Sequence, residues 1–337
     1  MMHANSDAGT GGGPRPQWRP ATFEEATDTA DVVRARRSLR RRMIAMRALA
    51  LVLVVAAVVV GGTPFVLQWN TSRDLASQTR HVHQRVLGWP YPQAENQLRE
   101  ARAYNSRIAA GRQAVLGEAS DPFATTGGGS AASTQTDPAS SRDREYQSLL
   151  DTGGGVMGSI RIPKISVDLP IYHGTSEKAL ADGAGHLYGT SLPVGGVNTH
   201  AVVTGHRGLV AAPMFTRLDE LRNGDFFYIE VMGERLAYQV DSITVIEPDD
   251  ASTMRVVPGQ DRVTLMTCTP YGVNTHRLLV SGHRVSVPYQ APEPADVHDA
   301  RLLAMMAATA VLLVGLLLWM SFAKRHGRTM RMRHARL

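Results

Sequence analysis

The chain has 337 residues and a formal net charge of +6, from 36 Lys and Arg against 30 Asp and Glu. Residues 70–300 carry 20 basic and 25 acidic side chains, so the positive excess lies at the two ends and argues against a nucleic-acid-binding face on the central part. The single cysteine excludes both an intramolecular disulfide and a zinc site built from several thiolates.

The first third of the chain begins with a polar, basic segment. Residues 1–43 are predicted to be a disordered cytoplasmic tail. The uncharged run from Ala48 to Leu67 is long enough to cross a bilayer, so residues 44–68 are assigned to a transmembrane helix. A cleaved signal peptide is the alternative, but the run is too long and Pro64–Leu67 offers no small-residue cleavage site.

A second uncharged run extends from Leu302 to Ala323 and predicts a second transmembrane helix. The basic tail 324–337 follows it, and seven Arg lie between Arg34 and Arg47, just before the first run. The positive-inside rule therefore predicts a two-pass protein of the plasma membrane. Both termini would lie in the cytoplasm and the segment between the spans outside the cell.

Residues 69–152 are expected to form an extracellular helical segment followed by a loop. Glu95–Ala110 shows a loose apolar periodicity and predicts a helix. From Gly117 to Thr152 the sequence is rich in Gly, Ser, Thr and Asp, which predicts a long mobile segment. At the other end, residues 291–301 are assigned to a spacer that leads into the second span, and the Pro-rich stretch 288–294, which overlaps its start, makes it stiff.

Between these segments, residues 153–290 consist of short alternating apolar runs separated by Gly and Pro, a pattern typical of an all-β domain. A short helix is expected at Pro213–Leu221. Seven or eight strands with few helices favour a closed or nearly closed antiparallel barrel. The candidate strands are Gly158–Ile162, Val167–Tyr172, Ala201–Thr204, Phe226–Val231, Leu236–Ile246, Arg262–Thr267 and Arg277–Val287.

Three residues at predicted strand ends have the chemistry of a cysteine acyl-transfer enzyme. Cys268 offers a nucleophile, which must become a thiolate near neutral pH. His206 is the residue type that usually donates a proton to a leaving amine. Arg277 offers a cation for an oxyanion. The nine-residue spacing between Cys268 and Arg277 allows them to face each other across a hairpin.

Spacing alone leaves alternatives open. Cys268 could be a small buried hydrophobe, and Arg277 could be a solvated strand residue. Nothing in the spacing brings His206 to the thiol, and His200, His276 and His283 are competing candidates.

Three segments closely resemble the class C, pilin-polymerising sortases. They are Gly185–Gly196, Thr204–Gly208 and the run from Thr264 to Arg284, in which TLMTC is followed by PYGVNTHRLLV. The resemblance covers about 158–288. It implies an eight-stranded sortase barrel in which His206 is the acid/base, Cys268 the nucleophile and Arg277 the substrate or oxyanion stabiliser. The expected fold class is thus mostly β, with short helices, a helical and lid segment before the barrel, and two transmembrane helices.

The tripeptide Asp121–Phe123 is similar to the lid motif of that family. The resemblance implies that Asp121 lies near Arg277 and that Phe123 covers Cys268 until substrate displaces them. An ordinary Asp-Pro turn is the alternative.

The resemblance implies that the enzyme cleaves an LPXTG-like sorting signal between Thr and Gly and forms a thioacyl intermediate on Cys268. The acyl group is then transferred to a Lys amine of a pilin subunit. Pilin or surface-protein substrates and the membrane are the expected partners, with no nucleic acid and no cofactor. Three alternatives are a housekeeping sortase that anchors proteins to peptidoglycan, a hydrolytic cysteine peptidase, and a non-enzymatic membrane-tethered β-domain.

Overall fold

A computed structural model of the chain describes residues 22–111, 139–209 and 212–287, and near the C-terminus 304, 307–315 and 318–319. The chain forms two compact units, Met1–Val60 and Gly61–Leu337. The two lid residues, Asp121 and Phe123, lie outside the described residues.

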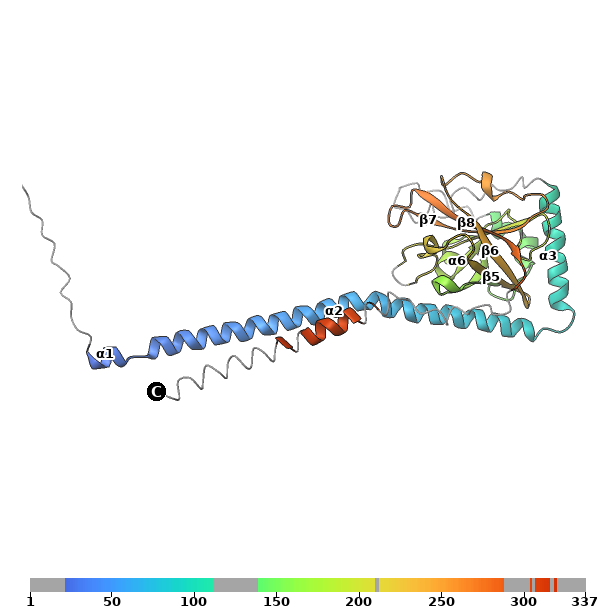
Figure 1. Cartoon of the computed structure of the whole chain (residues 1–337). Helices are drawn as coiled ribbons and strands as arrows, with labels where there is room; N and C mark the ends of the chain where they lie inside the picture. Colours follow the sequence, from blue (N-terminus) through green and yellow to red (C-terminus); the bar gives the residue numbers. More distant parts are fainter. Residues whose placement is uncertain are drawn as a thin grey trace, which may run out of the picture. The chain divides into compact units, whose positions relative to one another are not determined.

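The long helix α2 (Ala30–Leu87) follows the short helix α1 (Phe23–Thr27) (Figure 1). It contains the apolar run 48–67, and in the part of the chain that the structure describes it is the one helix long and apolar enough to cross a membrane. Residues 30–43, assigned to the disordered tail from sequence, are helical instead. Ala, Arg, Leu and Met, which predominate there, are all strong helix formers.

The structure describes the second predicted span, 302–323, only in part. Residue 304 and the stretches 307–315 and 318–319 are helical. These pieces are shorter than a membrane-spanning helix, so the second span stays a prediction.

The domain of the second unit is a closed barrel of eight strands in the order β1-β2-β3-β4-β7-β8-β6-β5. Its members are β1 (Val156–Ile162), β2 (Val167–His173), β3 (Ala184–His186), β4 (Thr199–Thr204), β5 (Phe226–Val231), β6 (Glu234–Ile246), β7 (Asp261–Thr269) and β8 (His276–Val285). Seven of these correspond to predicted strands. The three-residue β3 was not predicted as a strand, because it is too short to show alternation.

The barrel is mixed, whereas the sequence suggested an antiparallel one. β2 pairs with β3 in parallel, and β4 pairs with β7 in parallel. Both pairs are joined by long connections, as parallel neighbours require. The helix α6 (Glu177–Asp182) lies in the first connection, and three-residue 3-10 helices at Pro163–Ile165, Leu218–Glu220 and Ser252–Met254 lie in other loops. The second of these is all that forms of the helix expected at Pro213–Leu221.

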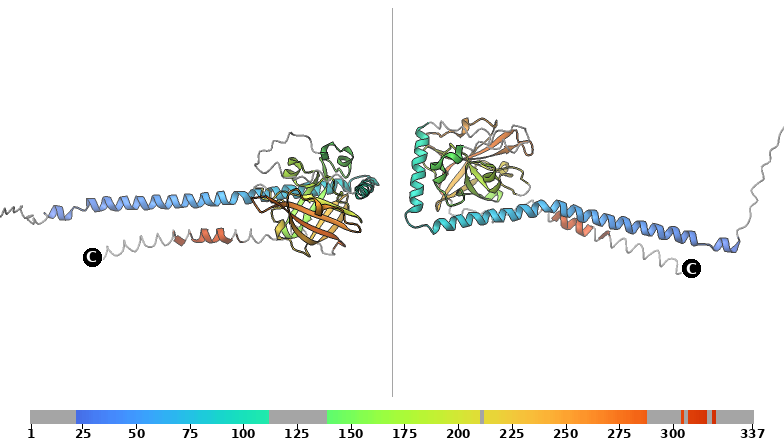
Figure 2. Two further views of the ribbon diagram at one scale, coloured as in Figure 1. Left: turned by 90° about the horizontal axis from the view of Figure 1, so that it is seen from above. Right: turned by 180° about the vertical axis from the view of Figure 1, so that it is seen from behind.

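Two helical segments that precede the barrel pack against it. The helix α3 (Gln93–Ala110) runs along one side of the barrel, as Figure 1 and the right view of Figure 2 show. Asn105 of this helix is buried, and its side-chain amide both donates to and accepts from the backbone of Leu192. Leu75 and Val86 of α2 belong to the same hydrophobic core as the barrel strands.

The end of the predicted mobile segment is also ordered. The short helices α4 (Ala139–Arg142) and α5 (Arg144–Ser148) lie within Gly117–Thr152. Tyr146 of α5 is fully buried, and its hydroxyl lies 2.9 Å from Nδ1 of His186. One buried aromatic side chain thus ties this segment to β3.

Candidate active site

The pairing of three neighbouring strands brings the predicted catalytic residues into one row. In the antiparallel pair of β7 and β8, Cys268 lies directly opposite Arg277. In the parallel pair of β4 and β7, Thr204 lies opposite Met266. His206 and Cys268 each lie two residues further along, so His206 follows the end of β4 beside Cys268. Adjacent strands are about 4.8 Å apart, within the reach of side chains on one face.

The side chains of Cys268 and Arg277 share one face of the sheet, because the two residues are directly opposite each other. Residues two apart on a strand point the same way, so Cys268 shares its face with Met266. Met266 packs with Val202 of β4 and Leu279 of β8 in a small apolar cluster, separate from the main barrel core. Leu265, one residue earlier, belongs to that main core. Cys268 and Arg277 are therefore on the opposite face from the main core.

Cys268 is 5% exposed and packs against Leu180 of α6. This helix begins at the N-cap Ser176, whose side chain accepts a hydrogen bond from the backbone N–H of Ala179. Sequence reasoning missed α6, because a six-residue helix is too short to show periodicity. The apolar side chain of Leu180 limits access of water to the thiol.

His206 is 8% exposed, and its backbone carbonyl accepts a hydrogen bond from the N–H of Phe215. Burial lowers the pKa of the imidazole below its ordinary value, while the carboxylate of Glu177 on α6 acts in the opposite direction. A neutral imidazole is thus favoured near neutral pH, and it can accept the thiol proton.

Arg277 is 2% exposed. Its Nη1 donates to the backbone carbonyls of Asn274, at 2.9 Å, and His276, at 2.8 Å. The guanidinium therefore also fixes the loop between β7 and β8. A buried cation opposite the thiol is suited to stabilise negative charge that develops at that position.

The three competing histidines interact with other groups. His200 is buried between the carbonyl of Arg255 and Oγ1 of Thr264. His276 approaches Glu247, and His283 approaches Asp241 on the surface. Each of these three is held by another group, and His206 is the candidate histidine that follows β4 at the strand end where Cys268 lies.

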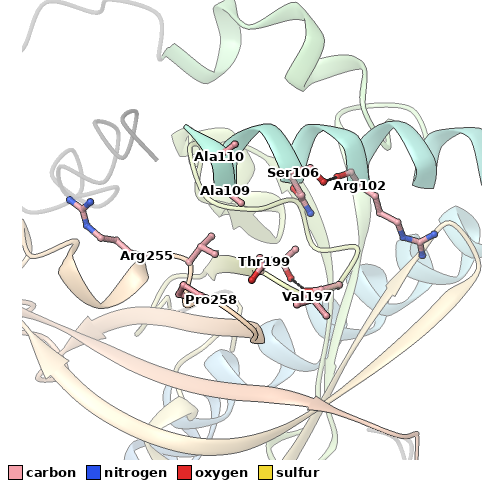
Figure 3. A pocket seen from close by; sticks show the side chains of 13 residues that line it. Arg102, Ser106, Ala109, Ala110, Val197, Thr199, Arg255 and Pro258 are labelled. Carbon is pink, nitrogen blue, oxygen red and sulfur yellow. Dashed lines mark hydrogen bonds between the residues drawn. The ribbon is translucent and has the colours of Figure 1, made fainter. Parts of the chain in front are cut away.

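A large cavity of about 790 Å³ lies away from this row. Its walls are the C-terminal part of α3 and the loops before β4 and β7, the opposite strand ends from His206 and Cys268. Figure 3 shows Ala109 and Ala110 of α3 across from Pro258, with the side chain of Arg255 directed away from the middle. None of His206, Cys268 and Arg277 lines this cavity, so it is a poor candidate for the active site.

Residues 160–285 match the family model for the sortase domain. Among solved structures, the chain is similar to sortase C-1 from Actinomyces oris, with 44% identity and a TM-score of 0.50, over 58% of this chain and 99% of that one. It is similar to sortase C1 of Streptococcus agalactiae, with 42% identity and a TM-score of 0.53, over 62% and 97% of the two chains. It is also similar to sortase C-1 from Streptococcus pneumoniae, with 41% identity and a TM-score of 0.54, over 64% of this chain and 100% of that one.

Curated relatives include sortase D of Bacillus subtilis (strain 168), which is 30% identical over 136 residues, or 40% of this chain and 66% of that protein. Sortase A of Streptococcus agalactiae serotype III (strain NEM316) is 29% identical over 34% of this chain and 47% of its own length. The chain thus spans about half to two thirds of these curated relatives.

Proposed function

Since the chain belongs to the sortase family of cysteine transpeptidases, we propose that it joins secreted proteins by acyl transfer, with Cys268 as the nucleophile. The pairing of Cys268 with Arg277 across β7 and β8 carries the proposal, and the place of His206 just after β4, the parallel neighbour of β7, supports it. Each residue type matches one requirement of the reaction.

The first half-reaction forms the thioacyl intermediate. His206 accepts the thiol proton, and the sulfur of Cys268 attacks the carbonyl carbon of Thr in an LPXTG-like sorting signal. Arg277 stabilises the oxyanion of the tetrahedral intermediate. The C–N bond to Gly then breaks as His206 returns the proton to the leaving amine.

In the second half-reaction an amine attacks the thioester and releases Cys268. We assign this amine to a Lys side chain of a pilin subunit. The class C sortases among the similar structures support this choice, and pilin substrates are named for the sortase C of Streptococcus pneumoniae. The product is an isopeptide bond between two proteins.

The membrane anchor follows from the apolar run in α2. We propose spans at 44–68 and 302–323, with the barrel, residues 153–290, outside the cell and both termini in the cytoplasm. Substrates held in the same membrane would meet the enzyme in one plane, which raises their effective concentration. The lid of Asp121 and Phe123 stays part of this proposal.

Trapping an acyl-enzyme tests the proposal. The full-length chain is incubated in lipid nanodiscs with LPXTG-type peptides, and intact-protein mass spectrometry measures adducts on Cys268. We expect an adduct that lacks the residues after Thr, and none for Cys268→Ala. Added Lys-containing pilin should convert the adduct to an amide, whereas release of free acid alone would indicate a hydrolase.

A further inference from the structure

Arg207, the residue directly after His206, forms hydrogen bonds to the end of β7, where Cys268 lies. Arg207 has a buried side chain, 8% exposed. Its Nη1 donates to Oγ1 of Thr269 at 3.0 Å and approaches the backbone carbonyl of Cys268 at 3.4 Å. The guanidinium thus crosses from the loop after β4 to the end of β7.

The other side of the same guanidinium is also held. Its Nη2 donates to the carboxylate of Asp219, in the 3-10 helix Leu218–Glu220, at 2.6 Å. A buried cation is costly unless it is paired and hydrogen-bonded. The planar fork of Arg suits several acceptors at fixed angles better than a Lys ammonium does. The position of Arg207 is therefore determined at both ends.

The loops after β4 and β7 also pack closely beside this contact. Gly208 has φ +84°, and a Cβ at this position would lie 3.1 Å from the ring of Tyr271. The same ring has its centroid 6.0 Å from Cζ of Arg207. Only glycine meets both conditions at position 208, because a side chain there would be strained and would push against Tyr271.

His206 lies just past the point where the strand pairing ends. The ladder between β4 and β7 ends with Thr204 opposite Met266. The next link is Gly205, whose N–H donates to the carbonyl of Met266 and whose carbonyl accepts from Oγ1 of Thr267. The contacts of Arg207 continue this connection on the far side of His206.

We propose that Arg207 is a positioning residue that keeps the imidazole of His206 at working distance from the thiol of Cys268. The inference rests on the proposed transpeptidase reaction, in which a proton passes between these two side chains. A misplacement of about 1 Å at such a step costs about a hundredfold in rate. Arg207 itself acts on the loop rather than on the reacting atoms.

The test compares Arg207→Gln, Arg207→Lys and Asp219→Asn with the parent, all as full-length chains in nanodiscs with equal folded fractions by circular dichroism. We expect kcat to fall between about tenfold and a hundredfold in Arg207→Gln, with KM nearly unchanged. Smaller losses are expected for the other two variants, which also keep the test possible if Arg207→Gln does not fold. The matched control is Arg217→Gln, because Arg217 pairs with Glu220 in the same turn. An unchanged kcat in all three Arg207 and Asp219 variants would overturn the proposal.

A second measurement separates positioning from a direct effect on the thiol. The rate of Cys268 alkylation by iodoacetamide is measured for Arg207→Gln in the parent and in the His206→Ala background. We expect slower alkylation in the parent background and no change in the His206→Ala background. An equal change in both would show that Arg207 acts on Cys268 without His206. This assay needs no peptide substrate, so it reads out Arg207 even if acyl transfer to the chosen peptides fails.

Discussion

Arg277 lies directly opposite Cys268 in the antiparallel pairing of β7 and β8. Both side chains are buried, with exposed fractions of 2% and 5%. The pairing holds a cation at a fixed distance from the site of attack without help from a flexible loop. When the thiol attacks a substrate carbonyl, the oxyanion that forms on the carbonyl oxygen would meet a guanidinium that needs little reorganisation.

Replacement of Arg277 is expected to lower the rate of acyl transfer. In Arg277→Ala, kcat/KM for a sorting-signal peptide should fall by about 10² to 10³, the typical cost of one oxyanion donor. Arg277→Lys should recover only part of this loss, because the ammonium cannot reproduce the planar fork. Steady-state assays on purified chains measure both effects.

The control for this variant is Arg284→Ala, since Arg284 is on the same strand, with its guanidinium 5.6 Å from the ring of Tyr238. Its kcat/KM should stay near that of the parent. A fall of the same size in both variants would mean that the loss comes from general damage to β8. Arg277 would then have no particular role in catalysis.

The burial of His206 predicts a defined acid limb in the pH profile. Desolvation lowers the pKa of His206 below 6.5, so most of the imidazole is still neutral at pH 6.5. Below its pKa the ring is protonated and cannot accept the thiol proton. A plot of kcat/KM against pH between about 5 and 8 should therefore show an acid limb with its midpoint below 6.5.

His283→Gln serves as the comparison, because His283 lies on the surface beside Asp241. Its profile should match that of the parent. A midpoint above 6.5 in the parent would contradict the proposed neutral resting imidazole.

The sequence indicated the barrel and the three catalytic candidates for different reasons. Alternation in runs such as Phe226–Val231 predicts strands, because one face of each strand is buried. The pairing of Cys268 with Arg277 could be anticipated from their spacing across a hairpin. The position of His206 could not, since it depends on the parallel pairing of β4 and β7, which are separated by the 56 residues 205–260. Resemblance to a family supplied what spacing alone left open.

Other features of the site leave no local pattern in the sequence. Arg207 is one of 36 Lys and Arg residues, and its role appears only once Asp219 and Thr269 are brought beside it. Likewise, Tyr146 lies in a segment whose composition predicts a loop, and its burial depends on a partner 40 residues away. Long-range contacts of this kind are set by the tertiary fold, which overrides local composition.

The proposed lid makes a prediction about thiol reactivity. If Phe123 covers Cys268 and Asp121 pairs with Arg277, then Phe123→Ala and Asp121→Ala should each raise the rate at which a thiol reagent labels Cys268. Stopped-flow labelling of the full-length chain measures the rates. Ser120→Ala, next to the motif, is the matched control. Equal rates in parent, Phe123→Ala and Asp121→Ala would remove the lid from the proposed mechanism.

The fully buried His186 predicts a loss of stability in mild acid. Its Nε2 donates to the carbonyl of Ser191, so in the neutral ring Nδ1 accepts from the hydroxyl of Tyr146. Burial lowers the pKa of His186 from 6.5 to about 4. The unfolded chain therefore takes up a proton at a higher pH than the folded one does, and the free energy of unfolding falls as the pH drops from 6.5 towards 4. The difference between the two pKa values corresponds to a loss of about 3 kcal/mol in the free energy of unfolding. This loss develops between pH 6.5 and 4 and is negligible well above pH 6.5.

Urea denaturation at several pH values tests this, with His186→Gln as the variant that cannot titrate. The Gln variant should be less stable near neutral pH, because it does not reproduce both hydrogen bonds, but its stability should fall less steeply between pH 6.5 and 4 than that of the parent. Tyr146→Phe is the matched control: it removes the hydroxyl that bonds to His186 and accepts from the N–H of Gly174, and it keeps the titrating ring. Its stability should be lower by about 1 to 2 kcal/mol while the steep acid slope stays. Parallel slopes in the parent and His186→Gln would mean that His186 takes up its proton in the folded state as readily as in the unfolded chain, and that the acid sensitivity comes from other groups.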